Sequence, residues 1–336
     1  MNLEEKLKDK KVLLFCVKTF NYEVEIKKKI ESYGAEVYYY DERPKDSHFV
    51  RGLIRLKRSL YEKKIEKYYQ DILDSDLCSK IDFLLVIRGE VVPDFFLKNL
   101  KKKNPKCKLI FYTWDSFKNH SHPQQNLHHY HLTSSFDQGD CKEYNMIYRP
   151  LFYLDVYKKI KPTSFEECSY MMLFIGTAHS DRYKISNALA REVISKGHKV
   201  FTYYFMHSRA VYFFKRLFEK GFGHVKYSEL AFKSISSNQV TELYKKSLAV
   251  LDIQHPNQSG LTMRTFETLG SGRKLITTNK IIKNYDFYNE NNVYIIDREN
   301  PTVNFEFYKK PFLPYSKDVL SHMSMEGWLH DLISRC

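Results

Sequence analysis

Residues 249–279 read AVLDIQHPNQSGLTMRTFETLGSGRKLITTN, an order of apolar and polar positions that predicts strand, loop, helix, turn and strand. The mainly apolar run at each end is typical of strands buried on both faces of a parallel sheet. The loop between them contains Gly260 and leads into a helix that we expect to start near Thr262. The stretch therefore predicts a β-α-β unit with a loop at the carboxyl end of its first strand, where such sheets bind ligands.

The helix within this stretch suggests an anionic ligand. Its first turn, from Thr262, presents free N–H groups and the positive end of the helix dipole, which suits a diphosphate. Arg264 in that turn can add a charge-assisted hydrogen bond. Glu267 follows three positions later on the same face and can accept both hydroxyls of a ribose, as an acidic residue does in dinucleotide sites. The alternative is a plain crossover helix with a surface arginine and glutamate.

The strand–helix–strand order occurs twice more, once near residue 11 and once near residue 170. In each case a glycine, Gly34 or Gly197, ends the helical pattern. Two such openings predict an α/β chain with two doubly wound domains in tandem. The expected strands are 11–17, 36–40, 81–87 and 108–113 in the first domain, and 170–175, 199–205, 249–253, 274–278 and 292–296 in the second.

The domain bounds follow from these strands. We expect a first domain at 1–155 and a second at 165–315, with a linker around 153–167 that has no clear period. A last helix around 319–334, in the segment 316–336, is expected to pack back on the first domain.

The composition narrows the class of protein. The 336 residues, 43% of them hydrophobic, suffice for two cores. No apolar run reaches the roughly 18–20 residues of a membrane span, and the charged N-terminus is not a secretory signal, so we expect a cytoplasmic protein. Six scattered cysteines without a CxxC pair fit a reducing compartment. The formal charge of +14 favours an anionic partner, which can be nucleic acid, a membrane surface or a phosphorylated substrate.

The stretch 249–279 resembles the donor-binding region of GT-B glycosyltransferases. The chain is most similar to the bacterial glycosyltransferase-like proteins of lipopolysaccharide, capsule and spore-coat gene clusters. This resemblance implies two Rossmann-like domains facing a cleft, an acceptor domain followed by a nucleotide-sugar donor domain, and a lipid-linked or oligosaccharide acceptor. Many retaining members carry two glutamates eight positions apart, of which the second binds ribose. Glu267 matches the second, and Ser259 stands at the first, which leaves the stereochemical outcome open.

A second candidate for donor binding is the turn after the strand at 170–175. Gly176 and Thr177 follow the strand, and Arg182 opens the next helix. Gly176 would let the backbone approach a phosphate, and Arg182 can neutralise it. The resemblance implies that this turn faces the donor diphosphate. An ordinary turn with a solvent-exposed arginine is the alternative.

Three stretches of the first domain, 87–90, 112–116 and 134–140, resemble segments that line the cleft in the same proteins. Asp115 follows a predicted strand and is the candidate general base, because an inverting transfer needs a group that takes the acceptor hydroxyl proton. Asp137 and Glu90 are its rivals. The alternative for Asp115 is a helix-capping or turn role.

Several other signals do not predict a site. Asp74 and Asp76 spell a DxD, but at a helix end before a strand, so we interpret it as a surface turn. Five histidines between residues 120 and 131 lack acidic or thiol partners at a firm spacing, and a polar loop explains them. We therefore expect no cofactor and no essential metal. The segment 49–73 has the pattern of a basic amphipathic helix, which can lie on an anionic membrane or simply face the core.

The leading interpretation is a metal-independent glycosyltransferase of bacterial surface polysaccharide synthesis, cytoplasmic or peripheral on the inner membrane face. A non-hydrolysing sugar-nucleotide epimerase on the same scaffold is the first alternative. A basic nucleic-acid-binding protein is the second, although the basic residues are spread along the chain and no recognition module is present, so we expect no nucleic acid partner. The donor base, the sugar, the acceptor and the oligomeric state stay open.

Overall fold

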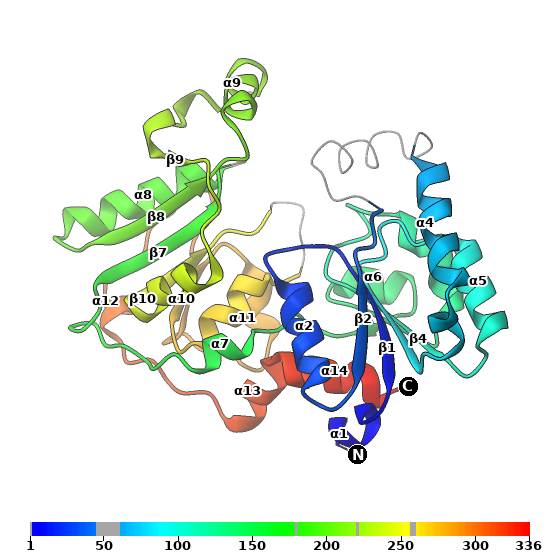
Figure 1. Ribbon diagram of the computed structural model, residues 1–336. Coiled ribbons are helices and arrows are strands. Elements are labelled where there is room, and N and C mark those ends of the chain that lie inside the picture. The colour runs from blue at the N-terminus through cyan, green and yellow to red at the C-terminus, as the bar shows by residue number, and fades with distance from the viewer. Residues whose placement is uncertain (1, 45–60, 179–180, 220–221, 256–259) are drawn as a thin grey trace. The chain divides into compact units, whose positions relative to one another are not determined.

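The computed structural model describes residues 2–44, 61–178, 181–219, 222–255 and 260–336. They divide into two compact units, Met1–Leu151 together with Met325–Cys336, and Phe152–Ser324. Each unit is built on one parallel sheet flanked by helices (Figure 1). The expected α/β class with two Rossmann-like domains is therefore confirmed.

The sheet of the first unit has the strand order β2-β1-β3-β4-β5-β6. Its central strands are apolar and buried along their length, as the continuous apolar runs predict. The order reverses between β1 and β3, which is where the carboxyl edge of such a sheet leaves room for a site. The strands are β1 (Lys11–Cys16), β2 (Glu36–Tyr40), β3 (Phe83–Ile87), β4 (Lys108–Thr113), β5 (Leu132–Ser135) and β6 (Ile147–Tyr148). The helices are α1 (Leu3–Leu7), α2 (Tyr22–Glu31), α4 (Glu62–Asp74), η2 (Asp76–Ser79), α5 (Asp94–Lys103), η3 (His122–His129), α6 (Gln138–Glu143) and α14 (Met325–Ser334).

The sheet of the second unit has the order β12-β11-β10-β7-β8-β9 and reverses between β7 and β10. The strands are β7 (Tyr170–Thr177), β8 (Val200–Phe205), β9 (Leu230–Ala231), β10 (Ser247–Asp252), β11 (Lys274–Thr277) and β12 (Val293–Ile295). The helices are α7 (Asp155–Lys158), α8 (Arg182–Ser195), α9 (Arg209–Phe218), η4 (Phe222–His224), η5 (Tyr227–Glu229), α10 (Ser237–Lys245), α11 (Met263–Gly270), η6 (Lys280–Asn284), α12 (Glu306–Lys309) and α13 (Lys317–Met323).

The C-terminal segment differs from the single helix expected over 319–334. The structure has two helices, α13 in the second unit and α14 in the first. Ser324, between the two helices, has an extended conformation and forms a parallel bridge with Tyr153. The helix α13 ends at this extended residue. On α14 the fully buried Trp328 packs its ring 5.1 Å from that of Tyr112.

Two other expected segments have a packing role. Tyr153 and Tyr157, in the segment expected to be a linker, are buried in the second unit. Of the basic segment 49–73, residues up to 60 lie outside the described part of the chain. The remainder belongs to α4, which buries Ile65, Tyr69 and Ile72 in the first core, so its described part faces the core. No described helix is long and apolar enough to cross a membrane.

Candidate functional site

The carboxyl edge of the second sheet holds most of the donor-site candidates. Strands β7 and β10 are neighbours, and the strand order reverses between them. The segments that follow Thr177 and Asp252 therefore leave the sheet side by side and run to opposite faces. Both candidate stretches from the sequence meet at this edge.

The N-terminus of α11 is anchored to the sheet by Asp252. This carboxylate is 4% exposed and accepts hydrogen bonds from the hydroxyls of Thr262 at 2.7 Å and Thr265 at 2.8 Å. Thr262 is the N-cap, as expected, and its hydroxyl accepts from the Thr265 N–H at 3.3 Å. The positive end of the α11 dipole is thereby fixed at the carboxyl edge.

Arg182 joins the ends of β7 and β10. Its Nε donates to the carbonyl of Ile253 at 2.8 Å, and its Nη1 donates to the hydroxyl of Thr177 at 3.2 Å. Burial lowers the pKa of Arg182, and the nearby charges of Arg264 and Arg298 lower it further, against the opposite effect of two aspartates. The charges of two further guanidinium groups therefore act on Arg182 at this edge, an arrangement that an anion would stabilise.

Arg298 is a member of this group that the sequence did not reveal. Its Nη1 pairs with Asp181 at 2.6 Å, and its Nη2 donates to the carbonyl of Gln254 at 2.8 Å and the hydroxyl of Thr278 at 3.1 Å. It thus ties together the segments after β7, β10 and β11. Because it follows β12, 44 residues after Gln254, no local motif connects it to the other arginines.

Arg264 and Glu267 lie one turn apart on α11, as predicted. Glu267 is 6% exposed. Burial by itself lowers the pKa of Arg264, but the Tyr244 phenol and the charges of Glu267 and Asp252 raise it above its ordinary value. The buried Nη1 of Arg264 makes no hydrogen bond to any described residue. A buried donor in this state is costly, and an oxygen of a ligand can satisfy it.

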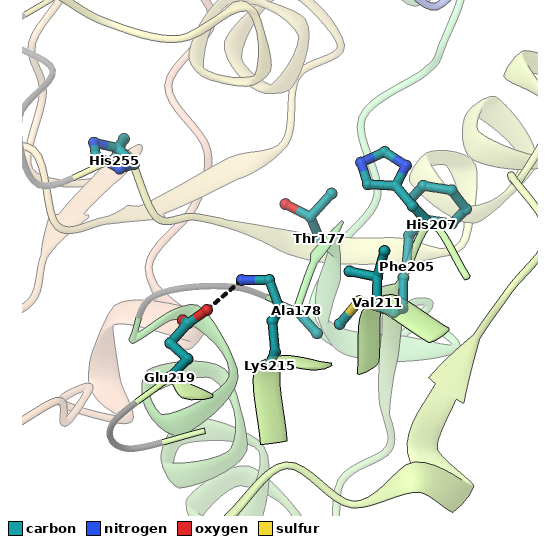
Figure 2. Close-up of a pocket in the computed structure, with 9 residues that line it drawn as sticks. Thr177, Ala178, Phe205, His207, Val211, Lys215, Glu219 and His255 are labelled. Atoms are coloured by element: carbon teal, nitrogen blue, oxygen red, sulfur yellow. Dashed lines mark hydrogen bonds and ion pairs between the residues drawn. The ribbon is translucent and has the colours of Figure 1, made fainter. Parts of the chain in front are cut away.

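A pocket of about 420 Å³ opens beside Thr177, whose hydroxyl accepts a hydrogen bond from Arg182. Its lining comes from the ends of β7 and β8, from α9 and from the segment after β10. Figure 2 shows Thr177 between His255 on one side and His207 on the other, with Lys215 paired to Glu219 at 2.6 Å nearby. The lining residues are Thr177, Ala178, Phe205, Met206, His207, Val211, Lys215, Glu219 and His255. Since Arg182 donates to the Thr177 hydroxyl, Arg182 lies beside a space of ligand size.

The two candidate glycines have different surroundings. A Cβ on Gly176 would lie 2.8 Å from the ring of Phe174, so packing inside the domain already requires glycine there. The carbonyl of Gly260 accepts a hydrogen bond from the amide of Asn279 at 3.2 Å. Ser259, which stands where many relatives of the suspected family have a glutamate, lies outside the described residues.

The first unit has a compact polar cluster at the carboxyl edge of its own sheet. Asp115 follows β4, and its Oδ2 lies 3.1 Å from His120 Nε2 and 3.4 Å from Arg88 Nη2. Arg88 also contacts His120 directly. Burial raises the pKa of Asp115, but the hydrogen bond from His120 and the charge of Arg88 outweigh it, so the pKa lies below its ordinary value. The structure thus brings Asp115 together with a histidine that the sequence analysis assigned to a polar loop.

The loop after β3 is fixed by a buried carboxylate. Glu42 is 0% exposed and accepts hydrogen bonds from the backbone N–H of Gly89 at 2.8 Å and of Glu90 at 2.6 Å. Arg88 and Gly89 have φ of 89° and 69°, a left-handed conformation that costs energy for arginine. Burial raises the pKa of Glu42 to about 8. The backbone at Arg88 is therefore held in an unusual conformation that aims its side chain at Asp115.

The two rivals of Asp115 lie in different places. Glu90 belongs to the cluster, 3.9 Å from Arg88 and 4.0 Å from both Arg43 and His120. Asp137 is the N-cap of α6 and accepts hydrogen bonds from Gly139 N–H and Asp140 N–H at 2.8 and 3.4 Å. Asp137 therefore has a capping role, and the structure does not join it to Asp115.

One group among the described residues has the donor set of a metal site. Asp94, His128 and His129 offer ligand atoms within 4.8 Å of one another, and Asp94 accepts from His129 at 2.6 Å. The group lies at the start of α5 and the end of η3. The DxD aspartates, Asp74 and Asp76, end α4 and begin η2, as the sequence placed them.

Comparison with known proteins addresses the fold. No family model and no curated protein matches the chain. A glycosyltransferase from Rickettsia africae ESF-5 matches with a TM-score of 0.54 at 13% identity, covering 97% of each chain. HepE from Anabaena, in complex with UDP and glucose, has a TM-score of 0.53 at 10% identity and covers 96% of this chain and 98% of that one. The catalytic domain of starch synthase IV from Arabidopsis thaliana, bound to ADP and acarbose, has a TM-score of 0.50 at 10% identity and covers 98% and 95%.

These identities are too low to transfer an activity, but the matches span nearly the whole of each chain. The two units, each built on a six-stranded parallel sheet flanked by helices, are consistent with the two Rossmann-like domains of the GT-B fold. The resemblance suggested by residues 249–279 is thereby confirmed for the architecture: this chain has the GT-B fold found in glycosyltransferases.

Proposed function

We propose that the chain is a glycosyltransferase that moves a sugar from a nucleotide-sugar donor to a lipid-linked or glycan acceptor in bacterial surface polysaccharide synthesis. The observation that carries the proposal is the group of Arg182, Arg264 and Arg298 beside the N-terminus of α11, at the point where the second sheet reverses its strand order. Structural neighbours with the same fold hold UDP or ADP.

The donor site follows from that group. A diphosphate would accept hydrogen bonds from Arg182 and from the buried Nη1 of Arg264. Glu267, in the next turn of α11, is assigned to the ribose hydroxyls. A pocket of about 420 Å³ beside Thr177 is large enough for part of a nucleoside.

The proposed transfer requires stabilisation of the leaving diphosphate and a base for the acceptor hydroxyl proton. The acceptor hydroxyl forms a bond to the anomeric carbon while the bond from that carbon to the diphosphate oxygen breaks. The nucleoside diphosphate leaves with the electron pair, and the arginines and the helix dipole stabilise its charge, so we propose that no essential metal is required. A base must take the hydroxyl proton.

We assign that proton to the pair formed by Asp115 and His120. The lowered pKa of Asp115 makes it a weak base alone. The imidazole of His120, whose Nε2 lies 3.1 Å from the Asp115 carboxylate, can take the proton at its other nitrogen, Nδ1. A carboxylate that orients a histidine and stabilises its protonated form is a recurrent catalytic arrangement. Arg88, which contacts both groups, keeps them in place.

A lipid-linked acceptor would place the reaction at the inner face of the membrane. We therefore propose a cytoplasmic enzyme that attaches there peripherally. The net charge of +14 is favourable for contact with anionic lipid.

The test is a panel of nucleotide sugars in thermal melting, followed by titration calorimetry of the best ligand against Arg182→Gln. Losing a charged hydrogen-bond donor costs roughly 1.5–3 kcal/mol, so affinity should fall about ten- to hundredfold. Arg191→Gln, an exposed arginine on the same helix, is the matched control and should bind normally.

Two outcomes would contradict the proposal. If no nucleotide sugar raises the melting temperature, the donor site is wrong. If the donor alone is converted to its epimer and no acceptor is glycosylated, the chain is an epimerase.

A further inference from the structure

Helix α9 (Arg209–Phe218) presents an apolar ridge to solvent. Phe213, Phe214, Leu217 and Phe218 are 55%, 63%, 77% and 71% exposed. Figure 1 shows α9 at the periphery of the second unit, beyond β9. Single exposed apolar residues are ordinary, but four large ones on a single short helix form a contiguous patch of the kind that marks a binding surface.

The helical geometry separates three sides of α9. At 100° per residue, the four ridge residues lie within an arc of about 140°. Val211, Lys215 and Glu219 line the pocket and lie on the neighbouring arc, about 20° to 100° beyond Phe218. Arg209 and Arg216 fall along one flank of the ridge. The ridge is therefore a surface of α9 whose residues do not line the pocket.

The surroundings of the ridge are basic. Residues 207–233 contain six lysines and arginines and two glutamates. Arg209 lies over the ring of Phe232 at 6.0 Å, and Arg216 donates to the hydroxyl of Tyr212 at 2.8 Å. Both guanidinium groups are thus held against aromatic rings that do not belong to the ridge. A Phe- and Leu-rich ridge with arginines along its edge is the pattern of helices that lie in the interface of an anionic bilayer.

A second copy of the chain fits this surface less well. Four side chains with these exposures offer on the order of 500 Å² of apolar area, whereas a stable protein interface buries about 800 Å² from each partner. An antiparallel two-fold contact through the ridge would also bring the arginine flanks of both copies together. A bilayer needs no such minimum area, and its anionic headgroups complement the arginines.

We propose that α9 inserts Phe213, Phe214, Leu217 and Phe218 into the interface of an anionic lipid bilayer, with Arg209 and Arg216 on the headgroup phosphates. The inference extends the proposed function, on which it rests for its biological setting only. Because the pocket is lined by residues of the same helix that are not part of the ridge, docking would bring the pocket to the membrane surface.

The test is co-sedimentation of the full chain with vesicles of phosphatidylcholine, with and without phosphatidylglycerol. The unaltered chain should bind the anionic vesicles and bind neutral ones more weakly. The double variant Phe214→Ser, Leu217→Ser should bind at least tenfold less, because two large apolar side chains no longer enter the bilayer. Arg209→Gln should bind about fivefold less.

The matched control is Ile194→Ser, which removes an apolar side chain that is 56% exposed on α8, and it should bind normally. The inference is overturned if the unaltered chain does not bind anionic vesicles. It is also overturned if the double variant binds them as strongly as the unaltered chain. It is also overturned if sedimentation shows a dimer that the double variant makes monomeric, since the ridge would then join two copies.

Thermal melting separates this inference from the proposed function. Both ridge variants should keep the melting temperature of the unaltered chain and its response to nucleotide sugars. If the chain binds vesicles but no nucleotide sugar raises its melting temperature, the membrane inference is supported and the proposed transferase function is contradicted.

Discussion

The carboxyl edges of the two sheets occupy the same position in the two domains but carry different chemistry. At the first edge, acidic and basic side chains pair with one another: Asp115 lies 3.4 Å from Arg88, and Glu42 is fully buried. At the second edge, Arg182 contacts Thr177 in the lining of a pocket of about 420 Å³, and the charges of Arg264 and Arg298 act on Arg182. The reversal of strand order creates a crevice at the carboxyl edge of each sheet. The residues that follow each strand determine which chemistry that crevice supports. We therefore propose proton chemistry for the first edge and anion binding for the second.

The largest effect should come from the proton acceptor of the first edge. We expect Asp115→Asn and His120→Gln each to lower turnover by about 10²–10⁴-fold, because general base catalysis contributes that much. Donor affinity in calorimetry should stay within twofold, since neither residue lies at the second edge. This separation of turnover from affinity is the signature to measure.

Asp94→Asn is the matched control, because Asp94 and His129 form a similar carboxylate–histidine pair away from the cluster, and turnover should not change. If Asp115→Asn keeps normal turnover while Glu90→Gln or Asp137→Asn abolishes it, the base is one of those residues. If all of them keep activity, the division between the edges fails.

The next effect belongs to the second edge. Glu267→Ala should weaken nucleotide binding about ten- to hundredfold, because a charged acceptor of two hydroxyls is lost. Thermal melting must accompany the calorimetry, since Glu267 is also an electrostatic partner of Arg264. Glu242→Ala, which removes an exposed glutamate from α10, should change neither measurement. Unchanged nucleotide affinity in Glu267→Ala would remove the ribose role.

A smaller effect is expected on the pH dependence of the free energy of unfolding, through Glu42 at the first edge. Glu42 has a pKa of about 8 in the folded chain, against an ordinary value of 4.5 in the unfolded chain. The folded chain therefore binds one more proton between these values. The stability that this proton supplies is complete below pH 4.5 and is lost as pH rises through 8, by up to about 1.4 kcal/mol per pH unit.

Denaturant unfolding at pH 5, 6, 7 and 8 measures this slope. Glu42→Gln should flatten it, whereas Glu36→Gln, which changes an exposed glutamate on β2, should not. Parallel slopes for Glu42→Gln and the unaltered chain would mean that Glu42 titrates normally.

The smallest effect is expected from chelation. Activity in EDTA should stay within twofold of the untreated enzyme, because the proposed donor site uses arginines where a metal would otherwise neutralise the diphosphate. None of Asp94, His128 and His129 is assigned to the donor site or to the proton acceptor, so a metal there should not affect turnover. Complete loss of activity that magnesium or manganese restores would overturn this expectation.

Much of the fold could be predicted from local sequence, with limits that have a physical cause. The apolar runs at 11–17 and 249–253 became β1 and β10 within two residues, because a strand buried on both faces must be apolar throughout. The short strands β5, β6 and β9 were not predicted. They are two to four residues long, which is too short for a period to show.

The candidate site residues likewise fall into those that local sequence indicated and those that it did not. Thr262, Arg264 and Glu267 were found because one helix carries all three at fixed spacing, and Arg182 was found because it follows a strand and a glycine. Arg298 was missed because strand β12 separates it from its partners. His120 was missed because the loop that brings its imidazole to Asp115 has no regular spacing.

The sequence by itself determined the α/β class, the two tandem domains and the helix that presents Arg264 and Glu267, because burial and helix geometry act over neighbouring residues. Only the tertiary structure decided which side chains meet. Arg88, with its left-handed backbone held through Glu42, reaches Asp115 and His120 from a different strand. Such a cluster depends on strand order and loop conformation, which no local period encodes. The same holds for α9, whose ridge is apolar in sequence like any core helix and is identified as a surface only by its exposure in the fold.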